Sequence, residues 1–151
     1  MELQLVVFSL AGEDFGVPID QVREIIRFTA VTKVPKAPVS VLGVINLRGR
    51  VIPVVSLRER FGFPAEEAGN ATRIVVSDLA GQTAGFVVDA VTEVLRLDEG
   101  AIEPPPASAS TVDSAFIKGI GKIDERLIIL LDLEKVFDFS VLARLTPAAS
   151  A

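Results

Sequence analysis

The chain has 151 residues, half of them apolar, and a formal net charge of −5. This length predicts one domain, or two small lobes that share a core, and the apolar content excludes a disordered chain. No apolar run approaches the about 20 residues that a membrane-spanning helix needs, so direct membrane insertion is not expected. The acidic charge argues against nucleic acid, whose binding depends on Lys and Arg neutralising phosphates.

Missing residue types restrict the chemistry further. The sequence has no His and no Cys, which excludes the common zinc sites and catalysis by Cys or with His assistance. An enzyme would have to use carboxylates and lysines alone, so we expect no catalytic activity, no metal and no cofactor. Residues 1–4 lack the basic and apolar regions of a secretory signal, and a cytosolic protein is therefore expected.

The first part of the chain predicts short β-strands joined by turns. Apolar runs at residues 5–10 and 15–18 flank a turn at residues 11–14. A β-rich run follows at residues 22–28. Residues 31–41 contain two prolines and predict an irregular connection.

A central segment predicts a β-hairpin with arginines near its turn. Asn46 and Gly49 are turn formers between two apolar runs, and Arg48 lies between them. Pro53 follows in the second run. Because proline cannot donate to a sheet ladder, we expect this strand to lie at a sheet edge or to contain a bulge.

The hairpin is followed by a predicted short helix. Ser56 and Glu59 have the spacing of a capping box, and Gly62 and Pro64 end the helix. Residues 65–70 then form a polar linker.

The second part of the chain repeats the first. Residues 16–27 align without gaps to residues 85–96, and residues 43–61 align to residues 119–137. A repeat of about seventy residues indicates two copies of one unit, each with about five short strands, and this favours small β-barrels. The approximate halves are residues 3–64 and 72–145, and an exchange of strands between them stays open. A longer loop is expected at residues 103–111, and helical spacing at residues 133–145.

The aligned positions help to separate structural residues from binding residues. Arg50 matches Arg126, which favours a structural role for both, whereas the counterpart of Arg48 is Asp124. Two interpretations of Arg48 stay open: a solvated turn residue, or a partner-binding residue, for which arginine on a rigid turn is well suited.

Two pairs of carboxylates also occupy matching positions. Asp20 matches Asp89, which favours a structural role in which each side chain bonds its own backbone. Glu24 matches Glu93, and we expect at least one of these to stay in solvent, where it could face a partner. Gly85, at the start of a β run, indicates a close backbone approach or a bulge.

Several motifs together resemble one known family. They are Phe-Gly-Val-Pro-Ile at residues 15–19, Gly-Val-Ile-Asn-Leu-Arg-Gly at residues 43–49, Gly-Phe-Val-Val-Asp at residues 85–89 and Arg-Leu-Ile-Ile-Leu-Leu-Asp at residues 126–132. With them, the sequence resembles the CheW family of chemotaxis coupling proteins over essentially its whole length. The resemblance implies one all-β domain over residues 1–151 with short helices, made of two SH3-like five-stranded β-barrels around a common hydrophobic core.

The resemblance also implies a function. Proteins of this family are adaptors without catalysis that link the histidine kinase CheA, through its regulatory domain, to the cytoplasmic tips of methyl-accepting chemotaxis receptors. A cytoplasmic protein associated with membrane receptor arrays is therefore expected. By similarity, the kinase-binding residues are Arg48, Asn46, Leu47, Gly49, Gly43 and Glu24. The receptor-binding residues are Val22, Ile74, Gly85 and Val94.

Alternatives stay open at this point. The chain could serve a chemosensory system other than the flagellar one, or be a generic SH3-like peptide binder, although a chain without Tyr or Trp is poorly suited to an aromatic-lined groove. An enzyme using Asp124 and Glu125 is a further alternative. A free-standing piece of the kinase is the last, and we expect a complete small protein instead.

Overall fold

The computed structural model describes residues 2–35, 41–64, 66–79, 81–104 and 116–137, and these are mostly β-structure. The strands are β1 (Glu2–Leu10), β2 (Glu13–Pro18), β3 (Val22–Arg27), β4 (Val41–Leu47), β5 (Arg50–Ser56), β6 (Arg73–Leu79), β7 (Gln82–Val88), β8 (Ala90–Asp98), β9 (Ile102–Glu103), β10 (Ile117–Ile123) and β11 (Arg126–Leu131). The helices are short: α1 (Leu57–Arg60), α2 (Leu133–Val136) and the 3₁₀ turns η1 (Ile19–Gln21) and η2 (Glu99–Ala101).

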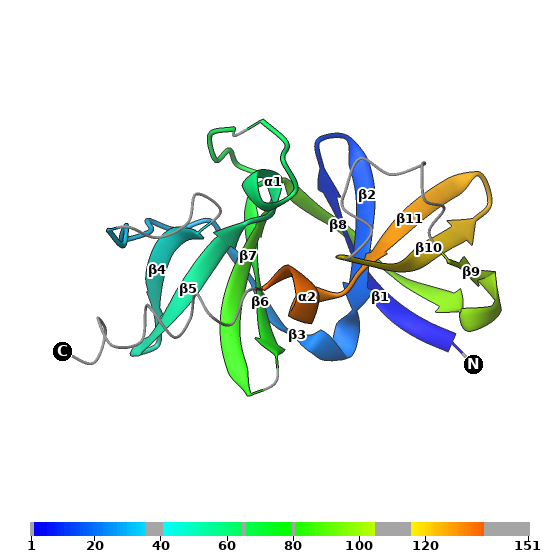
Figure 1. Cartoon of the computed structure of the whole chain (residues 1–151), viewed down its shortest axis with the longest axis horizontal. Helices are drawn as coiled ribbons and strands as arrows, with labels where there is room; N and C mark the ends of the chain where they lie inside the picture. The colour runs from blue at the N-terminus through cyan, green and yellow to red at the C-terminus, as the bar shows by residue number, and fades with distance from the viewer. Residues whose placement is uncertain (1, 36–40, 65, 80, 105–115, 138–151) are drawn as a thin grey trace.

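The strands form two sheets that lie side by side in Figure 1. The five-stranded sheet, on the left, has the order β3-β6-β7-β5-β4, and the six-stranded sheet has the order β8-β1-β2-β11-β10-β9. Each sheet combines strands of both repeats, because β6 and β7 join β3, β4 and β5, whereas β1 and β2 join the strands that follow β7.

Both sheets curl, but neither closes. In the five-stranded sheet the edge strand β4 is bonded to residues that follow the other edge strand, β3, through two backbone hydrogen bonds between Val44 and Thr32 of 2.8 and 2.9 Å. Within the described residues, neither sheet forms a closed hydrogen-bonded ring. The all-β prediction is therefore confirmed, while closed barrels are not.

A hydrophobic core lies between the two sheets and contains residues of both. Its aromatic members follow one another: Phe8 stacks on Phe15, Phe15 on Phe61, and Phe61 contacts Phe116, with ring centroids 6.1, 5.9 and 5.6 Å apart. Two further phenylalanines belong to the same cluster. Phe86 comes from the five-stranded sheet, and Phe137 directly follows α2. Each sheet also has a smaller cluster of its own, around Ile128 in one and Ile74 in the other.

Pro53 does not lie where the sequence predicted. Its strand, β5, is an interior strand between β7 and β4, so the prediction of an edge strand is wrong. The bulge in this hairpin falls on β4, between Val41 and Gly43. Proline is tolerated because the parallel pairing of β5 with β7 begins only at Val54, so no ladder partner on β7 faces Pro53.

The start of α1 agrees with the predicted cap. The Ser56 hydroxyl accepts a hydrogen bond of 3.3 Å from the Glu59 N–H, and Gly62, with φ of +83°, follows the helix. Most of the predicted loop at residues 103–111 and the end of the predicted helical segment at residues 133–145 lie outside the described residues. Across the part of the chain that the structure describes, no helix is long and apolar enough to cross a membrane.

Candidate functional site

The predicted arginine turn is a tight two-residue hairpin turn. Arg48 and Gly49 have φ values of +51° and +84°, which is the type I′ geometry that matches the twist of paired strands. The Asn46 side-chain oxygen accepts a hydrogen bond of 2.8 Å from the Gly49 N–H and fixes the turn. A positive φ is unfavourable for arginine, and such local strain is commonly found at functional positions.

Arg48 forms a two-pronged ion pair with Glu24. Its Nη1 and Nη2 atoms donate to the two carboxylate oxygens at 2.6 and 2.7 Å. These hydrogen bonds lower the pKa of Glu24 and raise the pKa of Arg48, so both groups are charged at neutral pH. The structure thus brings together two residues that the sequence assigned to the kinase-binding set.

The pair also joins the two edges of the five-stranded sheet. Glu24 lies on β3 and Arg48 follows β4, and these are the first and last strands of the sheet order. The Arg48 side chain is 70% exposed and that of Glu24 is 21% exposed. Glu24 therefore orients the guanidinium, while most of the Arg48 side chain stays exposed, an arrangement that lowers the entropy lost when a partner binds.

Gly43 supports this hairpin by its lack of a side chain. Its φ is +149°, and a Cβ at this position would overlap the carbonyl oxygen of Thr32. A residue other than glycine would separate β4 from residue 32 and open the edge contact. Gly43 is therefore placed to position the turn, and Leu47 lies within the hairpin, partly buried against the cluster around Ile74.

The four predicted receptor-binding residues do not share one surface. Val94, on the edge strand β8, is 53% exposed, and Val22, on β3, is half-buried against the shared core. Ile74 is fully buried and Gly85 is buried beside it. A Cβ at Gly85 would lie 2.7 Å from the Ile74 Cγ2, which confirms the close approach predicted there. Direct contact with a partner is thus open to Val94 and Val22, and the other two residues support the strands beneath.

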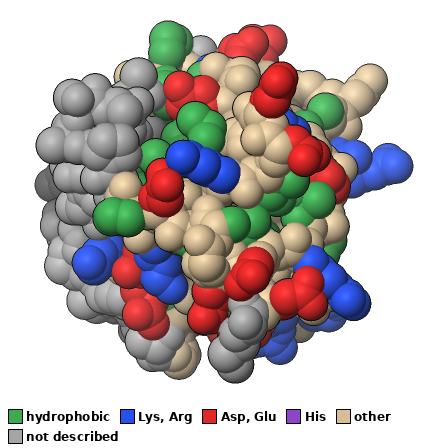
Figure 2. Space-filling view, turned by 90° about the vertical axis from the view of Figure 1, so that its right-hand side faces the viewer, with side chains coloured by type: hydrophobic (Ala, Val, Ile, Leu, Met, Phe, Trp, Pro, Cys, Tyr) green, Lys and Arg blue, Asp and Glu red, His purple; other side chains and the backbone are tan. Residues whose placement is uncertain are grey.

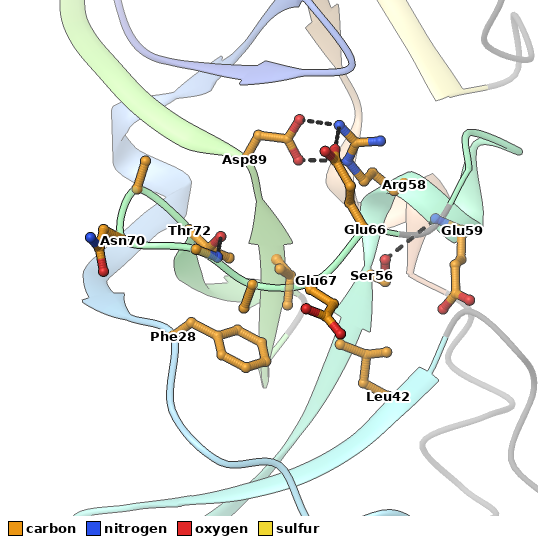
Figure 3. A pocket seen from close by; sticks show the side chains of 14 residues that line it. Phe28, Leu42, Ser56, Arg58, Glu59, Glu66, Glu67, Asn70, Thr72 and Asp89 are labelled. Atoms are coloured by element: carbon orange, nitrogen blue, oxygen red, sulfur yellow. Dashed lines mark hydrogen bonds and ion pairs between the residues drawn. The ribbon is translucent and has the colours of Figure 1, made fainter.

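The sequence missed a second ion-pair network, centred on Asp89 (Figure 3). The Asp89 carboxylate accepts hydrogen bonds from the Arg58 Nε and Nη2 atoms at 2.7 and 2.6 Å, and from the Ala11 N–H at 2.9 Å. The prediction that this side chain bonds its own backbone is wrong, because the fold brings the turn after β1 and the start of α1 against it. Arg58 also donates to the Pro64 carbonyl and pairs with Glu66 of the linker.

A cavity of about 550 Å³ lies next to this network. Phe28 and Leu42 lie on the side away from Asp89, and the linker residues Glu66 and Glu67 pass above them (Figure 3). Burial would by itself raise the pKa of Asp89, but the hydrogen bonds from Arg58 and Ala11 outweigh it and hold this pKa below its usual value. Among the described residues, no three His, Cys, Asp or Glu side chains are grouped so that they could hold a metal ion.

The surface over the six-stranded sheet has no single charge. Acidic and basic side chains alternate there with small hydrophobic groups (Figure 2). Arg126, on β11, pairs with Asp14 and Glu93 at 3.3 and 2.8 Å, so the carboxylate that matches Glu24 is bound to a different arginine in this repeat.

Comparison with known proteins identifies relatives of this chain and of its fold. The family model of the CheW-like domain matches residues 4–140. The chemotaxis protein CheW of Helicobacter pylori is 39% identical over 134 residues, which cover 89% of this chain and 81% of the relative. The chemotaxis protein CheW of Rhizobium meliloti is also 39% identical, covering 89% and 86%.

A solved structure agrees with the architecture as well. The scaffolding protein TtCheW from Thermoanaerobacter tengcongensis superposes with a TM-score of 0.85 at 43% identity, covering 91% of this chain and 89% of the other. The family model and the relatives each span most of the chain. The chain therefore belongs to the CheW-like family of chemotaxis adaptor proteins.

Proposed function

We propose that the chain is a non-enzymatic adaptor that couples the histidine kinase CheA to methyl-accepting chemotaxis receptors in the cytoplasm, at membrane receptor arrays. Family membership supports this proposal, and one observation carries it to particular residues. That observation is the exposed Arg48, held in an unfavourable backbone conformation by a tight turn and oriented by Glu24.

The kinase-binding surface in this proposal is the β4–β5 turn. An arginine whose charge is oriented but not buried can give its remaining donors to a partner without a large desolvation cost. Asn46 and Gly49 shape the turn, and Gly43 sets its place on the sheet. Leu47 lies beside Arg48 and closes the turn by pairing with Arg50.

The receptor-binding surface in this proposal is connected to that turn through one strand. Val22 and Glu24 lie two residues apart on β3, and Ile26 of the same strand pairs with Ile74 on β6. A receptor that presses on Val22 would displace β3 slightly and so shift Glu24 and its bound Arg48. Signals would pass as small changes in packing, because packed elements respond by discrete shifts.

The test is a binding measurement with the purified regulatory domain of the kinase and a receptor cytoplasmic fragment. We expect Arg48→Ala to weaken kinase binding by about 1–3 kcal/mol, the range for an interface arginine. Its effect on thermal stability should be small, because the Arg48 side chain that is removed is 70% exposed. Arg27→Ala is the matched control, since Arg27 is an exposed arginine on the same strand as Glu24.

Kinase binding by Arg48→Ala at the wild-type level would contradict the site assignment. Loss of receptor binding alone would instead place the turn on the receptor side. A wild-type chain that binds neither partner would contradict the proposed function itself.

A further inference from the structure

The two repeats treat one arginine differently. Arg50 and Arg126 occupy matching positions, each directly after a hairpin turn. Arg126 is neutralised by two carboxylates, with Asp14 at 3.3 Å and Glu93 at 2.8 Å. The hydrogen bonds that Arg126 donates to these carboxylates, the one to Glu93 above all, raise the pKa of Arg126.

Arg50 has lost both of these carboxylates. The position that matches Asp14 is Thr83, whose hydroxyl accepts a hydrogen bond of 3.2 Å from the Arg50 Nη2. The position that matches Glu93 is Glu24, and this carboxylate is bound by Arg48. Within the described residues, no carboxylate lies within ion-pair distance of Arg50.

The other carboxylate near Arg50, that of Asp78, already has partners. Asp78 accepts a hydrogen bond of 2.7 Å from the Thr83 hydroxyl, and Arg23 approaches it at 3.4 Å. The Thr83 hydrogen bond is the largest cause of the lowered pKa of Asp78, with smaller effects from Arg23 and, through space, from Arg50. Asp78 therefore stays charged at neutral pH but does not pair with Arg50.

Arg50 and Arg48 line the same recess in the surface. Both line a recess of about 70 Å³ at the end of the five-stranded sheet, together with Arg23 and Thr83. Three arginines stand here against the two carboxylates Glu24 and Asp78, so this spot is positive on a chain whose net charge is −5. A local charge opposite to that of the whole molecule selects for an oppositely charged group on a partner.

We propose that Arg50 is a specificity-determining residue of the kinase-binding surface, and that it binds an Asp or Glu side chain of the kinase next to Arg48. This inference rests on the proposed function. The guanidinium fork matches a carboxylate in geometry, and the Thr83 hydroxyl holds the fork in place without neutralising it. In the other repeat, the partner's carboxylate is replaced by Asp14 and Glu93 of the chain itself.

The experiment compares Arg50→Gln, Arg50→Lys and Arg126→Gln in the full chain, by titration with the kinase regulatory domain at several salt concentrations. We expect Arg50→Gln to weaken binding about 5- to 50-fold and to make the affinity less dependent on salt, as expected when a charged contact is lost. Arg50→Lys keeps the charge but not the fork, and should restore only part of the affinity. Arg126→Gln should bind within about twofold of the wild type, since its charge is already satisfied internally.

Three results with the variants would overturn the inference. Where the wild-type chain binds the kinase, Arg50→Gln could bind it with the same affinity. Alternatively, the affinity of Arg50→Gln could depend on salt as strongly as that of the wild type. Equal losses in Arg50→Gln and Arg126→Gln would show that the internal carboxylates make no difference. If the wild-type chain does not bind the kinase, the proposed function fails and the assignment of Arg50 fails with it. The wild-type measurement alone distinguishes that case from a failure of the Arg50 assignment.

Discussion

Position 77 and its counterpart in the other repeat carry very different side chains. Ser77, on β6, is fully buried, and its hydroxyl has no hydrogen-bond partner among the residues that the structure describes. The matching position of the other repeat is Phe8, which belongs to the aromatic series of the shared core. The two copies can therefore share a backbone arrangement while their side chains differ. Side chains at matching positions of the two sheets need to be complementary to each other, not identical.

Removal of this hydroxyl should stabilise the protein. We expect Ser77→Ala to raise the free energy of unfolding by about 1 kcal/mol. The buried serine hydroxyl loses its hydration on folding without forming a compensating hydrogen bond, and alanine avoids this cost. Urea denaturation of wild type and variant measures it. The control is Ser56→Ala, which removes the hydroxyl that caps α1 and should cost about 1 kcal/mol. A destabilised Ser77→Ala would indicate that this hydroxyl is bonded after all.

At the scale of the element, glycines decide how closely the strands approach. Gly85, on β7, lies against Ile74, and Gly43, on β4, lies against the backbone of residue 32. The tight turns use positive φ values as well, at Ala11, Arg48 and Asp124. At Gly43 a backbone carbonyl, and at Gly85 a side chain of a neighbouring segment, leaves no room for a Cβ.

A methyl group at position 85 tests this. We expect Gly85→Ala to lower the free energy of unfolding by about 1–3 kcal/mol, since its Cβ would lie 2.7 Å from the Ile74 Cγ2 in a packed cluster. Gly69→Ala is the matched control, because no atom lies within 4 Å of the added carbon there. Thermal unfolding compares the two, and equal melting temperatures would contradict the close packing. Receptor binding by the folded Gly85→Ala variant would additionally report on the proposed receptor-binding surface.

At the scale of the whole molecule, a few polar contacts tie the two sheets together beside the shared core. Asp89 lies between β7 of one sheet and β8 of the other, and it holds Ala11 of the β1–β2 turn and Arg58 of α1. Arg60 adds a second connection, from its Nε to the Val136 carbonyl at 2.9 Å and over the Phe116 ring. These contacts span up to 78 residues of sequence.

The Asp89 network makes stability depend on pH in a defined direction. The folded-state pKa of Asp89 is below its usual value, so its contribution is fully present above the unfolded-state pKa and is lost as pH falls through the folded-state pKa. Asp89→Asn should therefore be less stable than wild type at neutral pH, by about 1–3 kcal/mol for a part-buried charged hydrogen-bond network. The difference should shrink as the pH is lowered toward the acid range.

Denaturation curves measured from neutral to acid pH check this expectation. Asp20→Asn is the control, because Asp20 occupies the matching position of the other repeat, in η1. A constant difference between Asp89→Asn and wild type at all pH values would contradict the role of the carboxylate charge.

Local patterns in the sequence determined much of this account. Alternating apolar runs predicted the strands, and turn residues predicted the hairpin at Arg48. The aligned segments predicted the duplication, and the motifs indicated the CheW-like family. Each of these depends on residues close together in the chain, whose preferences hold wherever the segment is placed.

Only the tertiary structure decided which distant groups meet. The sheet order brings Glu24 to Arg48, diverts the matching Glu93 to Arg126, and joins Arg58 to Asp89. It also places β5 inside a sheet and buries Ile74. Sequence alone could not decide these points, because ion pairs and burial across many residues depend on strand order and register, which the two sheets settle jointly when they pack around one core.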